Sequence, residues 1–500
     1  MAEPRSRRRP TGRRVQSVVR DVFGLSELRH GQRAVIDSVL AGQHTLAIMP
    51  TGAGKSLCYQ VPAMIKPGMT VVVSPLIALM KDQFEKLAAL GIEAVQVNSA
   101  IPADEIRRAR KKIGRRSVEF VFTTPEQLAA PEFRTLVGRA AVDLLVIDEA
   151  HCISQWGHDF RPAYLESLRA IRTLGHPTVL ALTATAPPDV ADDIARQLNV
   201  GPLHVVNTGV HRPNLRYSVR PVASDLDKDR HLLEVLRHTD GATIVYCATI
   251  RHVEHVARQL ALEGVDAVSY HGRMRAPDRV SAQDRFMRGE VRLIVATNAF
   301  GMGIDRADIR AVIHYDLPGS VDVYYQESGR AGRDGQPADC ILLFQRSDRG
   351  LQSFFMAGRY PAHDDFLNLV EALRYVGEAR SVTFDAVRES SPGIPAGKLR
   401  VMLSVFKDAK LLRQRQGARL ELSPRLFSES VEPLAQAYEQ RRQKDREKLE
   451  QMVVYGQTAL CRTRFLVEAL GDPVPWERCD ICDNCTGVAV RAEAVAAGAA

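Results

Sequence analysis

The stretch from Leu46 to Ser56, LAIMPTGAGKS, constrains the fold of this chain more than any other. Its apolar start has the pattern of a buried strand, and its end runs into a helix-like segment. Gly52 and Gly54 let backbone N–H groups approach phosphate oxygens without a Cβ in the way, and the helix presents its positive end to the same charge. In such a loop Lys55 reaches the β- and γ-phosphates, and the Ser56 hydroxyl ligates Mg²⁺. The predicted nucleotide-binding residues here are Thr51, Gly52, Gly54, Lys55 and Ser56.

Length and charge limit the number of domains and the kinds of partner that this chain can have. The 500 residues are enough for two or three domains, and no apolar run approaches the ~18 residues of a membrane span. The net charge of +8 suits a polyanionic partner, although much of the excess lies in the first 20 residues. We expect residues 1–20 to form a basic, disordered arm, either a solubilising tail or a phosphate-contacting one. The N-terminus lacks an apolar signal segment, so secretion is not expected.

A second stretch delivers two adjacent carboxylates to the end of an apolar strand. Residues 144–147 are Leu, Leu, Val and Ile, and Asp148 and Glu149 follow at once. Two like charges this close would repel in an ordinary turn, so a cation is the natural explanation. We expect Asp148 to hold Mg²⁺ through water and Glu149 to orient and deprotonate an attacking water. His151, two residues on, is a further catalytic candidate.

Other strands of this first half also end in hydrogen-bonding side chains. Ser74 follows an apolar strand, and Thr183 and Thr185 follow another, where a parallel sheet presents its ligand edge; simple loop capping is the alternative. Gln32 opens an amphipathic helix upstream of the phosphate loop, and its amide matches the donor and acceptor edge of adenine. We predict that Gln32, with Arg29 beside it, contacts the base.

Aromatic and basic residues crowd into the segment directly after the carboxylates. Residues 152–164 read CISQWGHDFRPAY and include one of only two tryptophans. Aromatic side chains stack on unpaired bases, worth about 1–3 kcal/mol each, although a Trp-Phe pair more often belongs to a core. The position after Glu149 favours a sensor that links DNA to hydrolysis. Its candidate residues are Trp156, His158, Phe160 and Arg161.

A linker between about Gly201 and Asn214 separates a second α/β domain. In this domain an apolar strand runs into a glycine-rich turn, where Gly303 and Asp305 are expected to approach the ribose. Arg330 and Arg333 lie one helical turn apart and cannot lose their charge. They are candidates to stabilise charge on a transferring γ-phosphoryl group, with a surface salt-bridge pair as the alternative. Gln326 is added as a nucleotide-contacting candidate.

The eight cysteines fall into two classes. Four are scattered among apolar segments and are expected to be inert core thiols: Cys58, Cys152, Cys247 and Cys340. The other four are clustered, and two x₂ spacings plus an upstream thiol suit a filled, tetrahedral and therefore structural Zn²⁺ site, with an iron–sulfur cluster as the alternative. These predicted zinc ligands are Cys461, Cys479, Cys482 and Cys485.

Residues 360–425 are less regular. They combine helical apolar spacing with a short strand pair near residues 411–422, which predicts a small winged-helix-like unit; a plain helical connector is the alternative. Helices are expected from residue 433 to 470, and the charged run at 440–448 is expected to be a solvated helix face.

These motifs together resemble the RecQ family of superfamily 2 helicases. The resemblance covers about residues 20–345 and 455–485. The motifs that carry it are FGLSELRHGQ, MPTGAGKS, SPLIALMKDQ, DEAHCISQWGHDFRPAY, LTATA, VATNAFGMGID and QESGRAGRDG. Met49, in place of the first glycine of the generic phosphate loop, is familiar in helicase-type loops and argues against a kinase or GTPase.

The resemblance implies an α/β fold of two tandem RecA-like parallel-sheet domains, followed by a mainly helical accessory region with a Cys₄ zinc module. We divide the chain accordingly into an arm (1–20), helicase domain 1 (21–205), helicase domain 2 (206–348), a winged-helix-like region (349–428), a zinc-binding module (429–487) and an Ala-rich tail (488–500).

The implied activity is ATP-dependent 3′→5′ unwinding of DNA in recombination and repair, with ATP, Mg²⁺ and Zn²⁺ as cofactors. A DNA-stimulated translocase that remodels DNA without processive unwinding is the alternative, and a non-catalytic DNA scaffold is a third reading that would need a broken Lys55, Glu149 or arginine pair. The implied partners are single-stranded DNA and junctions of duplex with single strand, with a single-strand-binding protein and a topoisomerase as protein candidates. The expected location is the cytoplasm, on the nucleoid in a bacterium.

Overall fold

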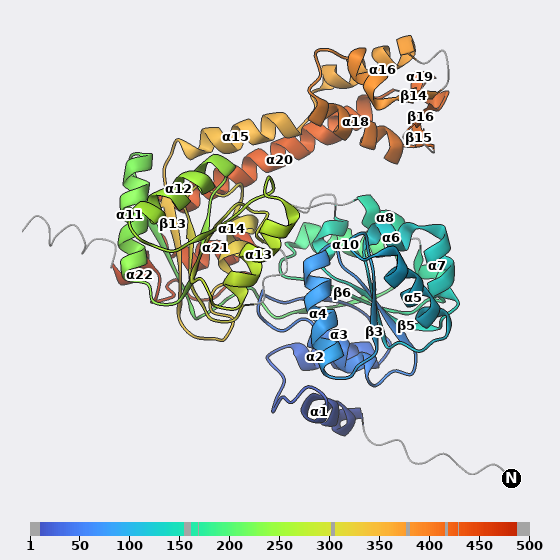
Figure 1. Ribbon diagram of the computed structural model, residues 1–500, viewed down its shortest axis with the longest axis horizontal. Coiled ribbons are helices and arrows are strands. Elements are labelled where there is room, and N and C mark those ends of the chain that lie inside the picture. Colours follow the sequence, from blue (N-terminus) through green and yellow to red (C-terminus); the bar gives the residue numbers. More distant parts are fainter. Residues whose placement is uncertain are drawn as a thin grey trace, which may run out of the picture. The chain divides into compact units, whose positions relative to one another are not determined.

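The computed structural model describes residues 11–154, 162–168, 170–301, 306–376, 381–415, 419–428 and 430–487. Its backbone divides into two compact units. The first runs to Asp316 and resumes over Asp322–Leu343 and from Thr458 onward, and the second comprises Leu317–Val321 and Phe344–Gln457. Figure 1 shows the elements of both.

The first half of unit 1 is built on a parallel sheet. Its seven described strands lie in the order β3-β4-β2-β5-β6-β1-β7. Its strands read as nearly continuous apolar runs because helices cover both faces of a parallel sheet. The strands are β1 (His44–Ile48), β2 (Met69–Val73), β3 (Ala94–Val97), β4 (Phe120–Thr123), β5 (Val142–Ile147), β6 (Thr178–Thr183) and β7 (Leu203–Asn207).

The helices of this half alternate with its strands, as expected for right-handed crossovers between parallel strands. They are α1 (Thr11–Asp21), α2 (Gln32–Leu40), α3 (Leu57–Ala63), α4 (Ile77–Ala89), α5 (Ala103–Gly114), α6 (Pro125–Ala129), α7 (Pro131–Gly138), the 3₁₀ turn η1 (Ala150–Ile153), α8 (Pro162–Leu168), α9 (Ala170–Thr173) and α10 (Pro188–Leu198).

Alternate residues of the central strands feed two cores, one on each face of this sheet. Leu46 and Ile48 of β1 belong to one buried cluster, whereas Ala47 belongs to the other. This follows from the two-residue period of a strand, which sends successive side chains to opposite faces. The strands are therefore held by packing on both faces, and this fixes the points at which the following loops begin.

A second sheet, in the order β10-β11-β9-β12-β13-β8, repeats this design. Its strands are β8 (Leu215–Pro221), β9 (Ala242–Tyr246), β10 (Val268–Tyr270), β11 (Leu293–Ala296), β12 (Ile309–His314) and β13 (Ala338–Phe344). Its helices are α11 (Asp225–Arg237), α12 (Ile250–Leu262), α13 (Ala276–Met287) and α14 (Val321–Ser328). The predicted fold class, two RecA-like parallel-sheet domains, is confirmed.

The last part of unit 1 packs on the second sheet through α21 (Arg462–Ala469) and α22 (Asp483–Thr486). Val467 and Leu470 join Val210 and Tyr325 in a small buried cluster. The four clustered cysteines lie in this part, so the cysteine module is anchored beside the linker that joins the two sheets.

Unit 2 contains a small antiparallel sheet in the order β14-β16-β15. The elements are α15 (Asp348–Arg359), α16 (His363–Val376), β14 (Ser381–Thr383), α17 (Phe384–Glu389), α18 (Ala396–Asp408), β15 (Leu412–Gln414), β16 (Arg419–Leu422), α19 (Arg425–Ser428) and α20 (Glu432–Gln457). Phe366, Leu399 and Phe406 belong to its buried core.

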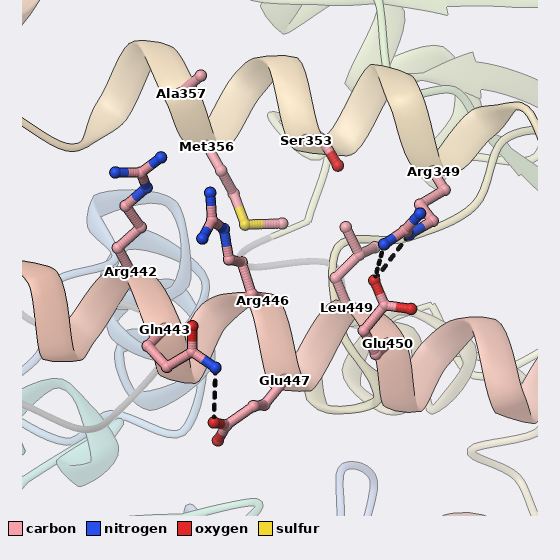
Figure 2. A pocket seen from close by; sticks show the side chains of 10 residues that line it. All are labelled: Arg349, Ser353, Met356, Ala357, Arg442, Gln443, Arg446, Glu447, Leu449 and Glu450. Carbon is pink, nitrogen blue, oxygen red and sulfur yellow. Dashed lines mark hydrogen bonds and ion pairs between the residues drawn. The ribbon is translucent and has the colours of Figure 1, made fainter.

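The pair α15 and α20 encloses a groove of about 630 Å³, which Figure 2 shows from close by. Within this groove Arg349 makes an ion pair with Glu450 at 2.5 Å, and Gln443 donates to Glu447 at 3.0 Å. None of the described helices in either unit combines the length and apolar character needed to cross a membrane.

Candidate functional site

The phosphate loop lies between β1 and α3, as its sequence predicts. Gly52 and Gly54 both adopt left-handed backbone conformations, with φ of +86° and +76°. A Cβ on Gly54 would stand 2.5 Å from Nε2 of Gln32, so a side chain at this position would collide with its neighbour. Both glycines are therefore required by conformation or by space.

Lys55 is buried in this loop and donates hydrogen bonds to backbone carbonyl groups. Its Nζ donates to the carbonyl oxygens of Met49 at 3.2 Å and Pro50 at 3.5 Å. Burial lowers the pKa of Lys55, and the carboxylates of Glu149 and Asp148 oppose that shift. An ammonium group held this way gains strongly from an anion, which is what a nucleotide phosphate would supply.

Gln32 lies under the loop and is fully buried. Its Nε2 donates to the carbonyls of Ala53 at 3.0 Å and Gly54 at 2.9 Å, and its Oε1 accepts from the N–H of Arg29 at 2.8 Å. The side chain of Arg29 donates to the carbonyl of Gly52. In this structure both amide hydrogens of Gln32 hold the phosphate loop, and its contact with the base stays a prediction.

Asp148 and Glu149 stand at the carboxyl end of β5. The backbone N–H of Asp148 donates to Val73 at 2.9 Å, and its Oδ2 accepts from Oγ of Ser74 at 3.2 Å. Burial and the neighbouring Glu149 raise the pKa of Asp148 to about 7. Glu149 has φ of 50° and ψ of 49°, a left-handed conformation that is uncommon for a residue with a Cβ. Such outliers cluster at functional sites.

His151 and Thr183 connect the carboxylate loop with the end of β6. Nδ1 of His151 lies 3.1 Å from Oγ1 of Thr183 and 3.4 Å from Oε2 of Glu149. Oγ1 of Thr183 in turn donates to the carbonyl of Thr185 at 2.9 Å. Ser74, Thr183 and Thr185, which the sequence analysis places at strand ends, thus lie in one network with the predicted catalytic carboxylates.

Tyr164 was missed by the sequence analysis. It is fully buried, and its hydroxyl donates to the carbonyl of Asp148 at 2.7 Å. Its sequence signal was present, since it is the last residue of the aromatic segment after the carboxylates, but it was not singled out as a site residue. The four residues predicted for that segment, Trp156, His158, Phe160 and Arg161, lie outside the described residues. The predicted ribose-contacting residues Gly303 and Asp305 of the second domain lie outside them as well.

The predicted arginines follow α14 in the second sheet domain, and Arg333 lies against the phosphate loop. A Cβ on Gly52 would come within 3.2 Å of Cγ of Arg333, and one on Gly329 within 3.3 Å of Cβ of Thr51. Within the described part of the chain, Nε of Arg330 and Nε2 of Gln326 are buried without a hydrogen-bond partner. Buried donors left in this state are costly, and a bound anion would satisfy them.

Arg212 is a site residue that the sequence analysis missed. Its guanidinium donates to the carbonyls of Thr51 at 2.7 Å and Gly332 at 2.7 Å, and also to those of Gly329 at 3.3 Å and Ala331 at 3.1 Å. It therefore ties the phosphate loop to the arginine loop through one side chain. The sequence shows only an arginine in a linker, and nothing there indicates contacts with residues more than a hundred positions away.

These parts border one cleft of about 280 Å³. The phosphate loop supplies Gly52 and Ala53, and the arginine loop supplies Arg333 and Asp334. The charged residues that line the cleft are Arg29, Arg212, Arg333 and Asp334, so it presents mainly positive charge beside the phosphate loop, as the binding of phosphate groups requires.

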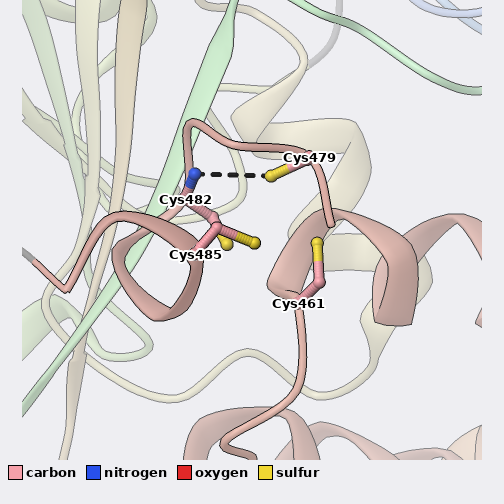
Figure 3. A group of neighbouring side chains, drawn as sticks. All are labelled: Cys461, Cys479, Cys482 and Cys485. Atoms are coloured by element: carbon pink, nitrogen blue, oxygen red, sulfur yellow. Dashed lines mark hydrogen bonds between the residues drawn. The ribbon is translucent and has the colours of Figure 1, made fainter. Parts of the chain in front are cut away.

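The four clustered cysteines come together as their spacing predicts (Figure 3). Their sulfur atoms all lie within 4.8 Å of one another. Cys461 caps the start of α21, and Cys479 accepts hydrogen bonds from the N–H of Cys482 at 3.3 Å and from Oγ1 of Thr463 at 3.2 Å. The contact with Cys482, together with the Thr463 bond, lowers the pKa of Cys479 to about 4, against the effect of burial. Four converging sulfur donors fit a structural Zn²⁺.

Charged side chains outside the cluster hold it in place. Nε of Arg462 donates to Asp483 at 2.6 Å, and both side chains are nearly inaccessible. The other oxygen of Asp483 accepts the N–H of Val219 at 2.8 Å, which ties the module to β8. Such supporting contacts orient the metal ligands.

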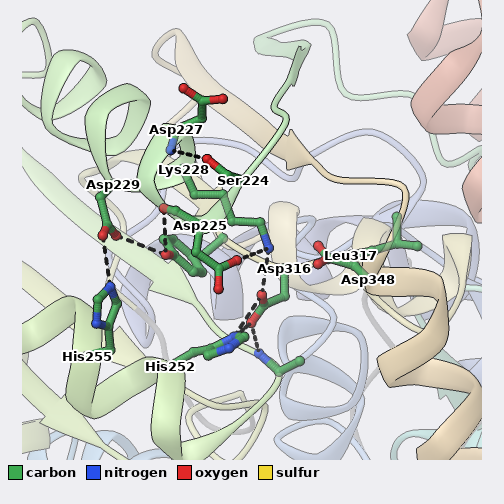
Figure 4. A network of polar contacts seen from close by, with 12 residues as sticks. Ser224, Asp225, Asp227, Lys228, Asp229, His252, His255, Asp316, Leu317 and Asp348 are labelled. Carbon is green, nitrogen blue, oxygen red and sulfur yellow. Dashed lines mark hydrogen bonds and ion pairs between the residues drawn. The ribbon is translucent and has the colours of Figure 1, made fainter.

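A separate buried network lies in the second sheet domain (Figure 4). Nζ of Lys228 lies 3.0 Å from Asp316, and both side chains are almost fully buried. Asp316 also accepts from the N–H of Ala248 at 2.8 Å and contacts Nδ1 of His252 at 2.8 Å. Every charge at its centre has a partner, so it reads as a structural network.

Family models match three parts of the chain. The DEAD/DEAH box helicase model matches residues 29–194, the helicase conserved C-terminal domain model residues 227–335, and the RecQ zinc-binding model residues 408–486. The probable ATP-dependent DNA helicase RecS of Bacillus subtilis is 35% identical over 82% of this chain and 83% of its own length. This chain belongs to the RecQ family of superfamily 2 helicases.

ATP-dependent DNA helicases named RecQ extend this result. The Pasteurella multocida protein is 42% identical over 66% of this chain and 52% of its own length, and the Bacillus subtilis protein 43% over 69% and 58%. This chain thus spans just over half the length of these curated RecQ relatives. The cofactors predicted for this RecQ-family chain, ATP, Mg²⁺ and Zn²⁺, are confirmed by the family match and the cysteine cluster.

Solved structures support the fold. The Mycobacterium smegmatis helicase Lhr, bound to ssDNA and AMP-PNP, has a TM-score of 0.55 at 21% identity, covering 82% of this chain and 60% of that one. The helicase MrfA bound to DNA has a TM-score of 0.55 at 19% identity, covering 84% and 60%. At identities this low, the similarity between this RecQ-family chain and the two structures shows a shared fold and nothing more.

Proposed function

We propose that this chain is an ATP-dependent 3′→5′ DNA helicase that unwinds duplex DNA while moving along single-stranded DNA. The observation that carries the proposal is the cleft where the phosphate loop of one sheet domain meets the arginine loop of the other. Its buried lysine donates to two loop carbonyls, and Nε of Arg330 and Nε2 of Gln326 are buried without a hydrogen-bond partner among the described residues. The domain divisions predicted from the sequence, including the two helicase domains at 21–205 and 206–348, belong to this proposal. The expectation of a disordered arm is wrong for residues 11–20, which lie in helix α1 because Val15 and Val19 are buried against the first domain.

Within the site, each residue has a proposed task. The loop N–H groups and Lys55 hold the β- and γ-phosphates, while Ser56 and Asp148 hold Mg²⁺, which when bound neutralises phosphate charge. Glu149 orients the attacking water and takes its proton. Arg330 and Arg333 stabilise charge on the transferring phosphoryl group.

A chain of contacts from the site toward the nucleic acid follows from the same network. His151 lies between Glu149 and Thr183, and Thr183 holds Thr185, so a change at the carboxylates reaches the end of β6. We assign DNA sensing to Trp156, His158, Phe160 and Arg161, which follow directly in sequence. Alternating closure and opening of the two sheet domains then moves the protein along a strand.

The proposal also covers the DNA substrates, the cellular location and the protein partners. The substrates are single-stranded DNA and junctions of duplex with single strand, in recombination and repair. The location is the cytoplasm, on the nucleoid in a bacterium. A single-strand-binding protein and a topoisomerase are the proposed protein partners.

Strand separation tests the proposal. With ATP and Mg²⁺, we expect the protein to separate a DNA duplex with a 3′ tail, but not a blunt duplex, a 5′-tailed duplex or an RNA duplex. Lys55→Ala should abolish separation and DNA-stimulated ATP hydrolysis, whereas Lys81→Ala, at an exposed helix position, should change neither. ATP hydrolysis without separation of any duplex, or full activity of Lys55→Ala, would overturn it.

A further inference from the structure

One helix of the first sheet domain carries a dense run of positive charge. Residues 106–116, which cover most of α5 and the two residues after it, contain seven lysines and arginines and no carboxylate. The helix macrodipole favours cations in the last turn, which explains Lys111 and Lys112. It does not explain Arg107 and Arg108, which lie one turn earlier. The nucleotide site makes no use of this charge, so it needs another explanation.

The cations of α5 form a row on its outer side. Ala109 and Ile113 are buried and hold the inner side of the helix against the domain. Arg107, Lys111 and Arg115 follow one another at intervals of four residues, so they share the opposite side, and all three are exposed. We call these three residues the basic row. At 1.5 Å per residue, the row is about 12 Å long.

The basic row is not neutralised by the protein. Within the described part of the chain, its three side chains make no ion pair or hydrogen bond. Two other cations of the same run are paired: Arg108 with Asp104 at 2.6 Å, and Lys112 with Glu93 at 2.8 Å. Ion pairing therefore takes up charge beside the row and leaves the row itself for a partner.

A second helix extends the positive surface. α7 packs against α5 (Figure 1), and the guanidinium of Arg116 donates to the carbonyl of Arg139 at 2.8 Å just beyond the ends of the two helices. Arg116 and Arg139 are both exposed. The surface thus continues from the basic row across the end of α5 to the end of α7.

The chemistry around the row indicates the kind of partner. Protein partners are anchored by large apolar side chains, and single-stranded nucleic acids by aromatic side chains on which bases stack. Residues 103–139 are all described, and none of their large apolar side chains is exposed, since Phe120, Phe122 and Phe133 are buried. The surface offers only charge in a straight line. This fits the phosphates of duplex DNA, a stiff polyanion with one charge per about 1.7 Å of its axis.

We propose that the basic row, together with Arg116 and Arg139, binds the phosphate backbone of duplex DNA without regard to base sequence. The surface is separate from the nucleotide cleft: α5 connects β3 and β4 at one edge of the first sheet, whereas the phosphate loop follows β1 near the other edge. None of the residues that line the cleft belongs to α5. The inference rests on the proposed function only for its DNA substrate.

The test uses the whole chain and a blunt DNA duplex of mixed sequence, without ATP. In a variant with the three residues of the basic row changed to Ala, duplex affinity should fall about tenfold. The slope of log affinity against log salt should become shallower by about three, one for each lost phosphate contact. Affinity for single-stranded DNA and the ATP hydrolysis that it stimulates should stay within about twofold of the parent, because no stacking side chain and no cleft residue is changed.

Two further variants separate the effect of this surface from general charge and from folding. Arg237, Arg258 and Arg288 are exposed on helices of the second sheet domain, and changing all three to Ala should leave duplex affinity nearly unchanged. Asp104→Asn should tighten duplex binding, because it releases Arg108 from its ion pair beside the row. Tighter binding cannot result from a loss of folding.

Several results would overturn the inference. They are a row variant that binds duplex like the parent, equal losses in the row and matched variants, an equal loss of single-stranded and duplex binding, and weaker duplex binding by Asp104→Asn. Polyglutamate that binds the parent more tightly than duplex DNA, and loses this binding in the row variant, would assign the surface to an acidic protein and also overturn it.

Strand separation of a 3′-tailed duplex tests the proposed function independently. A protein that binds duplex as expected here but separates none would contradict the helicase proposal alone. A protein that separates the duplex while its row variant binds blunt duplex like the parent would contradict this inference alone.

Discussion

Two aspartates at equivalent places in the two sheet domains behave in opposite ways. Asp148 follows β5 and Asp316 lies just after β12, each at the carboxyl end of a buried parallel strand and each under the influence of a buried lysine. Burial and Glu149 raise the pKa of Asp148 to about 7. The pKa of Asp316 is lowered, because His252, Lys228 and the Ala248 N–H outweigh its burial.

The difference lies in what surrounds each carboxylate. Asp316 has a lysine, a histidine and a backbone donor within hydrogen-bond distance, so its charge is satisfied by the protein itself. At Asp148, burial and the like charge of Glu149 outweigh the attraction of Lys55 and the hydrogen bonds from Ser74 and the Glu149 N–H. A buried charge that the fold does not satisfy indicates a site completed by a ligand, whereas a satisfied one indicates structure.

The largest effect is expected from the arginine loop. Arg330→Ala should lower DNA-stimulated ATP turnover by about 10³–10⁵-fold, the range for a cation that stabilises a transferring phosphoryl group. Some loss of stability is expected as well, because the Arg330 side chain hydrogen-bonds the buried Tyr246 hydroxyl, so turnover is compared in protein shown to be folded. Steady-state hydrolysis with and without single-stranded DNA measures this, with exposed Arg237→Ala as control. Turnover within tenfold of the parent would assign Arg330 to structure.

Removing the general base comes next. Glu149→Gln should lower ATP turnover by about 10²–10⁴-fold. It should not destabilise the protein, because it removes a like charge beside Asp148. ATP hydrolysis and urea unfolding, with Glu85→Gln on the surface of α4 as control, separate the two readouts. A variant that unfolds far more easily but keeps its ATP turnover would show that Glu149 has a structural role and not a catalytic one.

The opposite pattern is expected for Lys228→Met in the satisfied network. Breaking a buried ion pair by removing one partner costs about 3–5 kcal/mol of unfolding free energy, since Asp316 would keep its buried charge. Protein that remains folded should hydrolyse ATP normally. Denaturant unfolding measures the loss, with Lys81→Met as the exposed comparison. A stability equal to that of the control would show that this network is dispensable.

The smallest effect concerns pH. The hydrogen bond to Asp316 raises the pKa of His252, against burial and the charge of Lys228, with Asp225 adding to the rise. A raised folded-state pKa means that this stabilisation is complete below the unfolded value of about 6.5 and is lost as pH rises through the folded value. The lowered pKa of Asp316 acts only in acid, where its stabilisation is lost as pH falls.

His252→Asn should therefore flatten the decline in stability between about pH 6 and 8. Melting temperatures across this range for the parent, for His252→Asn and for His238→Asn would show it, the last as a control in which the pH slope is kept. A parent protein that becomes more stable across the same range, with no difference in His252→Asn, would contradict the assignment.

Much of the nucleotide site could be predicted from the sequence because its chemistry is local. A strand end, two glycines and a lysine in consecutive positions define the phosphate loop, and the strand before Asp148 could be recognised by its unbroken apolar run. The x₂ spacings likewise predicted the cysteine cluster. In each case a few neighbouring residues contain the whole pattern, so backbone geometry alone brings them together.

The supporting contacts could not be predicted in the same way. Arg212 reaches residues 161 and 120 positions away, and Lys228 meets Asp316 across 88 positions. Gln32 could be recognised as a site residue, but its hold on the phosphate loop depends on how α2 packs beside that loop.

The sequence by itself determined which chemical groups are present and which strand ends carry them. The reason is that the spacing of apolar residues in a strand and the short motifs after it each involve only a few neighbouring residues. Only the tertiary structure decided which charges are satisfied by the protein and which are left for a ligand. That depends on distances between side chains far apart in the chain, and on burial, which strengthens every charge interaction and penalises every unpaired one.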